Sequence, residues 1–262
     1  NNRMAATLEE TARAIFKSWF IDFDPVRAKS EGRPTHLPPE IDALFPDSFE
    51  ESELGPIPAG WVPATIRDIC TTIVNGSTPS RGRAEFWDSG TIPWFRTGEL
   101  SDGFLLDAAE KITPAGHSGS STKMLPRYSV VMAIYAAPTV GRLGITTSDA
   151  TFNQAMTGMV PKHDVGPWYL FERLYSLRQW FNDRANGAAQ QNISKAIVED
   201  APVVLPSKGI LDAYNELVAP MYHRRETLAG ESLTLAAIRD SLLPKLISGE
   251  IRCPIVEEDR DE

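Results

Sequence analysis

Residues 210–248 read ILDAYNELVAPMYHRRETLAGESLTLAAIRDSLLPKLIS, and this stretch decides how the chain is organised. Its apolar side chains recur every seven positions, at Tyr214, Met221, Leu228, Leu235 and Leu242. Such spacing predicts one long helix with a narrow apolar seam. The helix would extend about 58 Å at 1.5 Å per residue, which is longer than most small domains are wide. It therefore needs a partner to cover the seam.

The same stretch also carries residues that disturb a regular seam. Arg224, Arg225 and Glu231 interrupt the alternate seam positions, so the contact should be imperfect or polar in its middle. Pro220 and Pro244 lack a backbone N–H and should bend or shorten the helix. The periodicity alone also fits an ordinary amphipathic helix packed on a globular core.

A partner for this helix stands at the start of the chain. Residues 3–20 place apolar side chains at helical spacing, namely Met4, Leu8, Ala12, Ile15, Phe16, Trp19 and Phe20. Residues 7–10 (TLEE) resemble a capping box, although residues 4–6 indicate an earlier start. We expect the helices to pair antiparallel, with Ile15 and Phe16 against the C-terminal helix. The predicted fold is an α/β (α+β) globular head inserted between two long helices that form an antiparallel coiled-coil stalk.

The chain divides into five predicted segments. They are an N-terminal stalk helix at 1–30, a Pro-rich crossover linker at 31–60, the head at 61–207, the long C-terminal helix at 208–250 and an acidic tail at 251–262. The prolines of the linker argue for irregular structure there. Short apolar runs in the head predict strands at 64–74, 90–95, 128–135, 143–147, 157–160 and 201–205. Helical spacing predicts a helix at 168–182 and a short one at 192–198.

Charge and composition narrow the function classes. The net charge of −9 argues at first against a nucleic-acid partner. The acidic excess lies in the linker and after residue 207, whereas the head is balanced, which leaves room for one basic face. No window holds 18 uninterrupted apolar residues and the start lacks a signal pattern, so we expect a soluble cytoplasmic protein without a membrane partner.

Spacing also argues against several kinds of chemistry. Cys70 and Cys253 fit no metal or redox motif, and we expect them to be reduced. The four histidines share no ligand spacing, and no Gly-rich loop ending in Lys-Ser or Lys-Thr is present. Residues 22–25 (DFDP) lack the second proline and the aromatic residue of an adenine methyltransferase loop. We therefore expect no metal, no cofactor and no catalytic residues in this chain.

The order of several short motifs makes the interpretation specific. They are LEETARAIFKSWFIDFD at 8–24, Trp61, NGSTPS at 75–80, IPWFRTGEL at 92–100, VVMA at 130–133, TVGRLG at 139–144, FNQA at 152–155, QQNIS at 190–194 and LLPKLISGEI at 242–251. In this order they resemble the DNA-specificity subunit of type I restriction-modification systems. The resemblance covers nearly the whole chain.

The resemblance implies a non-catalytic protein that reads double-stranded DNA. Family members carry two target-recognition domains, each reading half of a split site, and their helices dock methyltransferase (modification) subunits. S-adenosylmethionine would belong to those subunits, and restriction to a separate restriction/translocase subunit. This chain has one such domain, so we expect either a half-length form acting as a homodimer or a fragment. The alternatives are an assembly scaffold that reads no DNA and a DNA-modifying enzyme.

The candidate DNA contacts are hydroxyl, amide and basic side chains in predicted loops of the head. They are Ser77, Thr78, Ser80, Arg81, Arg83, Arg96, Thr97, Thr139, Arg142, Asn153, Gln154, Gln190, Gln191, Asn192, Ser194 and Lys195. Hydroxyl and basic groups suit phosphates, arginine suits a guanine edge, and amides suit adenine. Ser194 and Lys195 would begin a helix whose free amides favour a phosphate. The structural alternatives to DNA contact are that these loops are only solvated, that a strand end is buried, and that the amides close turns.

The candidate subunit contacts are apolar residues of the two helices. They are Leu8, Ile15, Phe16, Trp19, Met221, Leu228, Leu235 and Leu242.

Overall fold

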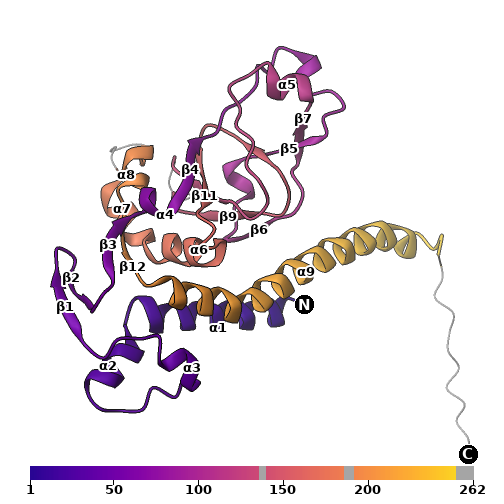
Figure 1. Ribbon diagram of the computed structural model, residues 1–262. Coiled ribbons are helices and arrows are strands. Elements are labelled where there is room, and N and C mark those ends of the chain that lie inside the picture. The colour runs from indigo at the N-terminus through magenta and orange to yellow at the C-terminus, as the bar shows by residue number, and fades with distance from the viewer. Residues whose placement is uncertain (136–139, 186–191, 252–262) are drawn as a thin grey trace, which may run out of the picture.

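The computed structural model describes residues 1–135, 140–185 and 192–251. Figure 1 shows a mixed α/β head above two long helices, one of which continues well beyond the other. The long helices are α1, Asn2–Phe20, and α9, Lys208–Ile247. The predicted fold class, an α/β head between two long helices, is confirmed.

Helices α1 and α9 run antiparallel, as the sequence predicts. The start of α1 meets the middle of α9, where Asn1 Nδ2 donates to Glu231 Oε2 at 3.0 Å. The end of α1 meets the start of α9, where the rings of Phe16 and Tyr214 lie 5.9 Å apart. The earlier helix start indicated by residues 4–6 is confirmed, and residues 7–10 form no capping box, because Thr7 lies inside α1 and its hydroxyl donates to Arg3 O.

Both prolines lie inside α9, so the predicted shortening is wrong. A proline leaves the carbonyl four residues earlier without its usual donor. Pro220 and Glu216 are both exposed, so water can bind that carbonyl at little cost. Pro244 lies in the exposed last part of the helix, where the same reasoning applies.

The paired helices also pack on the core of the head. Phe20, near the end of α1, is 3% exposed and its ring lies 5.0 Å from those of Tyr169 and Tyr214. Tyr169 belongs to α6, Pro167–Ser176, which lies between the helix pair and the sheets. Only the part of α9 beyond Ser232, which lies opposite Asn2 at the start of α1, projects from the body (Figure 1).

A polar network crosses the middle of the helix pair, where the sequence predicts an imperfect seam. Arg225 of α9 is buried and pairs with Glu9 of α1. Glu172 of α6 is 1% exposed, and its carboxylate accepts a 2.5 Å hydrogen bond from the Tyr222 hydroxyl. Burial raises the pKa of Glu172, against the effect of that hydrogen bond and of nearby Arg13. The network links three helices through buried polar groups, which are costly unless paired.

The predicted linker contains more regular structure than its prolines indicate. It follows α2, Asp24–Ser30, and holds the short α3, Pro39–Asp42, and a hairpin of β1, Phe49–Ser52, and β2, Gly55–Pro58. Phe45 is buried with its ring 5.0 Å from that of Trp19, so the linker packs on the main core. The hairpin tolerates its prolines because its strands have no further neighbours that need their N–H groups.

The head is built on a five-stranded sheet in the order β4-β11-β8-β9-β6. These strands are Cys70–Asn75, Met156–Pro161, Val130–Ala133, Leu143–Thr146 and Gly103–Leu105. A smaller sheet, β10-β5-β7, consists of Thr151–Phe152, Ile92–Phe95 and Glu110–Ile112. A two-stranded sheet joins β3, Val62–Thr65, to β12, Pro202–Leu205. The remaining short helices are α4, Ile66–Ile69, η1, Ala84–Phe86, η2, Thr97–Glu99, α5, Pro114–Ser118, α7, Arg178–Arg184, and α8, Lys195–Glu199.

Two predicted elements are divided in the structure. The strand predicted at 64–74 is interrupted by α4, which Thr65 caps while its own N–H donates to Asp68 Oδ2 at 2.8 Å. The helix predicted at 168–182 breaks at Leu177. At that break the Arg178 guanidinium binds Asp102 and the Gly141 carbonyl, which ties the new helix to the sheet.

Candidate nucleic-acid interface

Four strands of the large sheet have neighbouring termini at one end of the sheet, which we call the rim. The antiparallel register pairs Asn75, at the end of β4, with Thr157 of β11. It pairs Met156, at the start of β11, with Ala133, at the end of β8, and the adjacent residue of β8 pairs with Leu143, at the start of β9. The segments that follow β4 and β8 and precede β11 and β9 therefore emerge together. Most of the candidate DNA contacts lie in these segments.

The loop after β4 rests directly on the segment before β11. Gly76 N donates to Met156 O at 3.0 Å and Ser77 N donates to Phe152 O at 2.9 Å. A Cβ atom at Gly76 would lie 2.2 Å from Asn153 O, so only glycine permits this approach. The backbone thus brings two of the predicted clusters, 77–83 and 153–154, into one patch.

Side chains of the two clusters also contact each other. The Thr78 hydroxyl donates to the Gln154 side-chain carbonyl. The Ser77 hydroxyl lies 2.7 Å from the Ser121 hydroxyl, whereas Ser80 is exposed. The amide nitrogen of Gln154 remains available to a ligand, so this patch offers both donors and acceptors.

Arg96 and Thr97 reach the rim from the smaller sheet. Strand β5 ends at Phe95, whose carbonyl accepts a 3.0 Å hydrogen bond from Asn153 N. Arg96 follows with its Nη1 2.9 Å from Glu110 Oε1, and Thr97 begins the turn η2. Trp94 is buried at the end of this strand, with 2% of its surface exposed, whereas Arg96 projects, so the buried strand end that the sequence allows is present here.

The arginines of the 77–83 loop are held by acidic and aromatic partners. Arg81 pairs with Glu110 and lies over the Trp87 ring, 3.7 Å from its centroid. Arg83 Nε lies 2.7 Å from Glu85 Oε1. Each of these guanidinium groups has a carboxylate partner, which the sequence does not reveal.

A second patch lies beside the end of β8. Asn192 forms a bridge with Tyr135, and its Oδ1 is buried without a partner among the residues that the structure describes. The Ser194 hydroxyl caps α8, so the predicted short helix is confirmed from Lys195 onward. Lys195 Nζ lies 3.1 Å from Glu199, one turn later in α8.

Arg142 is a further candidate cation, in the loop between β8 and β9. It precedes β9 at the rim, and its carbonyl accepts a 2.9 Å hydrogen bond from Ala133 N. Within 1–135, 140–185 and 192–251, no carboxylate lies within salt-bridge distance of its half-buried side chain. Candidates Thr139, Gln190 and Gln191 lie outside the described residues.

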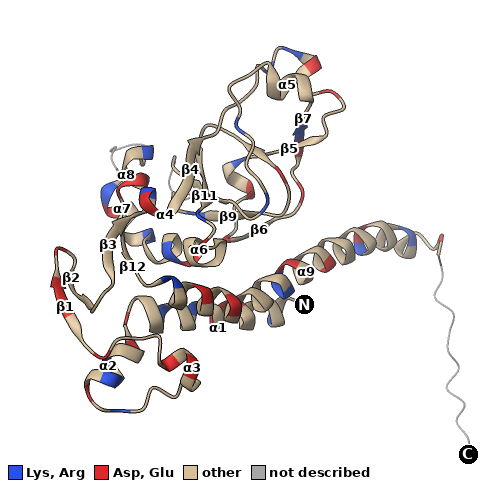
Figure 2. Ribbon diagram, in the orientation of Figure 1, with Lys and Arg blue, Asp and Glu red and all other residues tan. Residues whose placement is uncertain are grey.

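The surface of the head carries mixed charge. Figure 2 shows basic and acidic residues interspersed over it. This mixture follows from the pairs just described, since Glu110, Glu85 and Glu199 offset the neighbouring cations. A surface of this kind neutralises few phosphates by itself.

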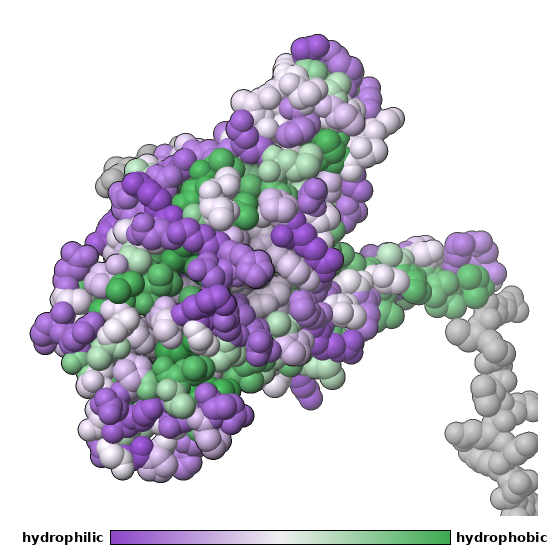
Figure 3. All heavy atoms as spheres, viewed as in Figure 1, coloured by the Kyte–Doolittle hydropathy of each residue, from purple (hydrophilic) through white to green (hydrophobic). Residues whose placement is uncertain are grey.

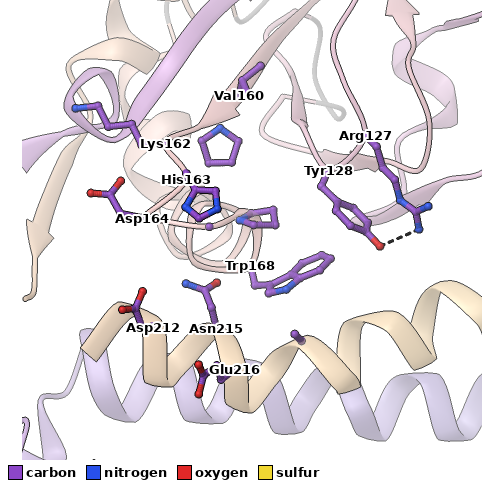
Figure 4. A pocket seen from close by; sticks show the side chains of 14 residues that line it. Arg127, Tyr128, Val160, Lys162, His163, Asp164, Trp168, Asp212, Asn215 and Glu216 are labelled. Carbon is purple, nitrogen blue, oxygen red and sulfur yellow. Dashed lines mark hydrogen bonds between the residues drawn. The ribbon is translucent and has the colours of Figure 1, made fainter. Parts of the chain in front are cut away.

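A cavity of about 520 Å³ lies away from the rim, between the other end of β11 and helix α9 (Figure 4). Trp168 lines it and stacks on Tyr222 with 4.4 Å between ring centroids. Arg127 and Tyr128 also line it and both bind Glu226 of α9, which joins the head to the helix. The sequence contains no motif that predicts this cavity, because its walls come from three separate segments.

The predicted subunit contacts divide into two groups. Phe16, Trp19 and Leu228 are buried within this chain, so they are not open to another subunit, and Leu8, Ile15 and Met221 are half-buried between α1 and α9. Leu235 and Leu242 are 58% and 41% exposed. Asn2, at the start of α1, lies opposite Ser232, so Leu235 and Leu242 lie beyond the part of α9 that pairs with α1.

The uncovered part of α9 forms an apolar surface that we call the distal α9 surface. It consists of Leu233, Leu235, Ile238, Leu242, Leu243, Leu246 and Ile247. Figure 3 shows hydrophobic atoms along this projecting helix. Among the helices that the structure describes, none is long and apolar enough to cross a membrane. Nor do the described residues contain a cluster of potential ligands that could hold a metal ion.

Comparison with known proteins relates the chain to one family. Residues 58–212 match the family model of the type I restriction modification DNA specificity domain. The chain is 26% identical to the type I restriction enzyme HindI specificity subunit of Haemophilus influenzae, with 96% of this chain and 63% of that protein covered. It is 21% identical to the MjaIX specificity subunit of Methanocaldococcus jannaschii, with 94% and 53% covered. The chain thus spans less than two thirds of these relatives.

Solved structures show the same fold. The S subunit of a type I restriction-modification system from M. genitalium superposes with a TM-score of 0.54 at 13% identity, covering 94% of this chain and 57% of that one. The HsdS subunit of Thermoanaerobacter tengcongensis gives 0.50 at 14% identity, with 95% and 58% covered. Because the family model covers more than half of the chain, this protein belongs to the type I restriction modification DNA specificity domain family.

Proposed function

We propose that this chain selects the DNA sequence on which a type I restriction-modification complex acts, reading half of a bipartite target at the rim. One observation carries the proposal: candidate contacts from separate segments, 77–83, 96–97, 142 and 153–154, gather at one end of the sheet. Loops held on a rigid sheet are typical of binding sites. Methyl transfer, with its S-adenosylmethionine, would belong to the methyltransferase subunits, and DNA cleavage to a restriction subunit.

The rim offers groups of the kinds that read bases. The Arg142 guanidinium has no carboxylate partner among the described residues, and arginine binds the two acceptors of a guanine edge in the major groove. The amides of Asn153 and Gln154 lie at the same end of the sheet, just before β11, and suit adenine. Hydroxyls of the 77–80 loop suit phosphate oxygens, which would position the rim on the duplex.

Exchange of the head tests the proposal most directly. The full chain would be combined with its methyltransferase subunits, and a duplex library would be methylated and sequenced. Replacing residues 61–206 with the head of another family member should change the methylated sequence, because the groups that touch base edges are exchanged. An unchanged methylated sequence would show that this chain is not the sequence reader.

A single substitution gives a quantitative version of this test. Arg142→Ala should weaken binding of the selected duplex by about 1–3 kcal/mol and relax preference at one base pair. Arg33→Ala is the matched control. It removes an exposed arginine that pairs with Glu31 and is distant in sequence from the residues of the rim. Equal effects of the two substitutions on the selected duplex, in a fluorescence titration, would assign only a general electrostatic role to Arg142.

An assembly scaffold that reads no DNA is the second candidate function. The carboxylate pairing of Arg81, Arg83 and Arg96 favours it, because paired arginines neutralise fewer phosphates. We expect weak DNA binding by the isolated chain and strong binding once methyltransferase subunits add basic surface. Titration of the assembled complex with duplex DNA at two salt concentrations separates the two candidate functions. A scaffold would add no sequence preference at either salt concentration.

The distal α9 surface supports association through the long helix. We infer that it docks partner subunits and a second copy of the chain around a two-fold axis. Leu235→Asp should abolish or weaken this association in sedimentation experiments, because it places a charge in the apolar surface. It should leave the thermal stability of the isolated chain nearly unchanged, since Leu235 is 58% exposed.

Leu228→Asp is the contrasting variant, because Leu228 lies one heptad earlier and is 1% exposed. It should destabilise the chain itself by burying an unpaired charge. Unaltered assembly of Leu235→Asp with methyltransferase subunits and with itself would refute the role of the distal α9 surface.

A further inference from the structure

Glu110 is a single carboxylate shared by two arginines that come from different segments. It begins β7, and its Oε1 lies 2.9 Å from Arg96 Nη1, just beyond β5. Its Oε2 binds Arg81 Nη1, which belongs to the loop after β4. The hydrogen bond from Arg81 and the two positive charges lower the pKa of Glu110, so the carboxylate stays ionised.

The register of the small sheet explains this convergence. Trp94 of β5 is directly opposite Glu110 of β7, so the two side chains share one face of the sheet. Arg96 follows Trp94 by two residues and therefore projects from the same face. The loop carrying Arg81 crosses this face, because its Ser77 carbonyl accepts a 2.9 Å hydrogen bond from Trp94 Nε1.

The rings of two tryptophans contact the Arg81 guanidinium. Its Cζ lies 3.7 Å from the centroid of Trp87 and 4.8 Å from that of Trp94. The two rings meet edge to face at 5.1 Å, and Trp87 Nε1 donates to Ser80 O at 3.1 Å. Cation–π contact and the carboxylate together restrict the guanidinium to one orientation. The nearby Glu99 contributes less, because its oxygens accept the backbone N–H groups of Arg96 and Ala109.

Each guanidinium still has donors to spare. An arginine carries five N–H groups, and Glu110 engages one nitrogen of Arg81 and one of Arg96. Both side chains are about half exposed, at 50% and 47%. The remaining donors can therefore reach a ligand at the rim without breaking the contacts to Glu110.

We propose that Glu110 is a specificity-determining residue, which orients Arg81 and Arg96 toward DNA and offsets part of their charge. The inference rests on the proposed function, DNA reading at this rim. Orientation favours the one duplex whose acceptors match the fixed donors, because less rotamer freedom is lost on binding. Charge compensation reduces attraction to every other duplex, since non-specific affinity follows the number of phosphates neutralised. Both effects increase the ratio of cognate to non-cognate binding.

The test compares four forms of the chain in complex with methyltransferase subunits. They are wild type, Glu110→Gln, Glu110→Asp and the control Glu85→Gln, which removes the same charge from a local pair with Arg83. A cognate duplex selected by the wild-type complex and a scrambled duplex are titrated at several salt concentrations. Arg81→Lys is an additional variant, which keeps the charge but loses the planar fork of the guanidinium. Thermal unfolding of each form separates binding effects from folding defects.

Glu110→Gln should lower discrimination about tenfold, which corresponds to the loss of one well-oriented base contact. It should also bind scrambled DNA more tightly, with a salt slope steeper by about one phosphate. Glu110→Asp and Arg81→Lys should lower discrimination without that change in slope, because they keep the charge and alter only the geometry. Glu85→Gln should affect the slope alone.

Two results would overturn the inference. Equal discrimination by Glu110→Gln and Glu85→Gln would show that Glu110 acts only through its negative charge, as Glu85 does. Wild-type discrimination by both Glu110→Asp and Arg81→Lys would show that orientation plays no part. Failure of the proposed function is separately visible, because a wild-type complex that does not distinguish the two duplexes contradicts DNA reading itself.

Discussion

Phe20→Ala should destabilise the chain by about 3–5 kcal/mol, the largest single effect that we expect. The ring is 3% exposed and lies against aromatic rings of three other elements. Its centroid is 6.0 Å from Trp61, 5.0 Å from Tyr169 and 5.0 Å from Tyr214. Removing it leaves a cavity where α1, α6, α9 and the start of the head meet, and rigid aromatic neighbours collapse poorly into such a space.

Chemical denaturation and thermal unfolding measure this effect. For a chain of this size, the expected loss lowers the melting temperature by roughly 6–20 °C. Met4→Ala is the matched control, because Met4 lies on the same helix and is 53% exposed. If Phe20→Ala and Met4→Ala unfold at the same denaturant concentration, the aromatic cluster does not hold the helix pair to the head.

Gly76→Ala should disrupt the rim itself, with a stability cost of about 1–3 kcal/mol and loss of sequence discrimination. The added Cβ would lie 2.2 Å from Asn153 O and 2.3 Å from Phe152 O. Both obstacles are backbone atoms, so no side-chain rotation relieves the clash. The loop must move away from the segment before β11, which separates Ser77 and Thr78 from Gln154.

Gly98→Ala provides the control for this change. Gly98 also lies near the rim, in η2, but a Cβ there meets nothing within 4 Å. The two variants are compared by denaturation and by methylation of the duplex library in the assembled complex. Retention of wild-type selectivity by Gly76→Ala would mean that the close approach of the two segments is unimportant for recognition.

The elements with long or clear periodicity could be predicted from the sequence. Helices α1 and α9 agree with the predicted ranges to within about two residues, because many apolar positions support each one. Their antiparallel pairing followed from facing apolar stripes. Strands β6, β7 and β10 were missed, because two or three residues show no measurable alternation.

The candidate site was predicted in part. The residue types indicated which loops carry candidate DNA contacts, and the structure brings two of them, 77–78 and 153–154, into contact. Glu110 was missed, since an isolated glutamate in a segment with no recognised strand gives no signal. Its importance depends on pairing with Trp94 across β5 and β7, which are separate in sequence. The carboxylate partners of Arg81 and Arg83 could likewise not be predicted from the sequence.

The sequence by itself determined the two long helices, their mutual orientation and the residue types available for recognition, because these depend on local spacing and on side-chain chemistry. Only the tertiary structure decided which arginines are already paired, which seam residues remain exposed and which loops share the rim. Pairing and exposure depend on distances between residues far apart in the chain. Leu228 and Leu235 occupy equivalent heptad positions, yet one is buried and the other is 58% exposed, because Leu235 lies beyond Ser232, where α9 passes the first residues of α1 in the structure.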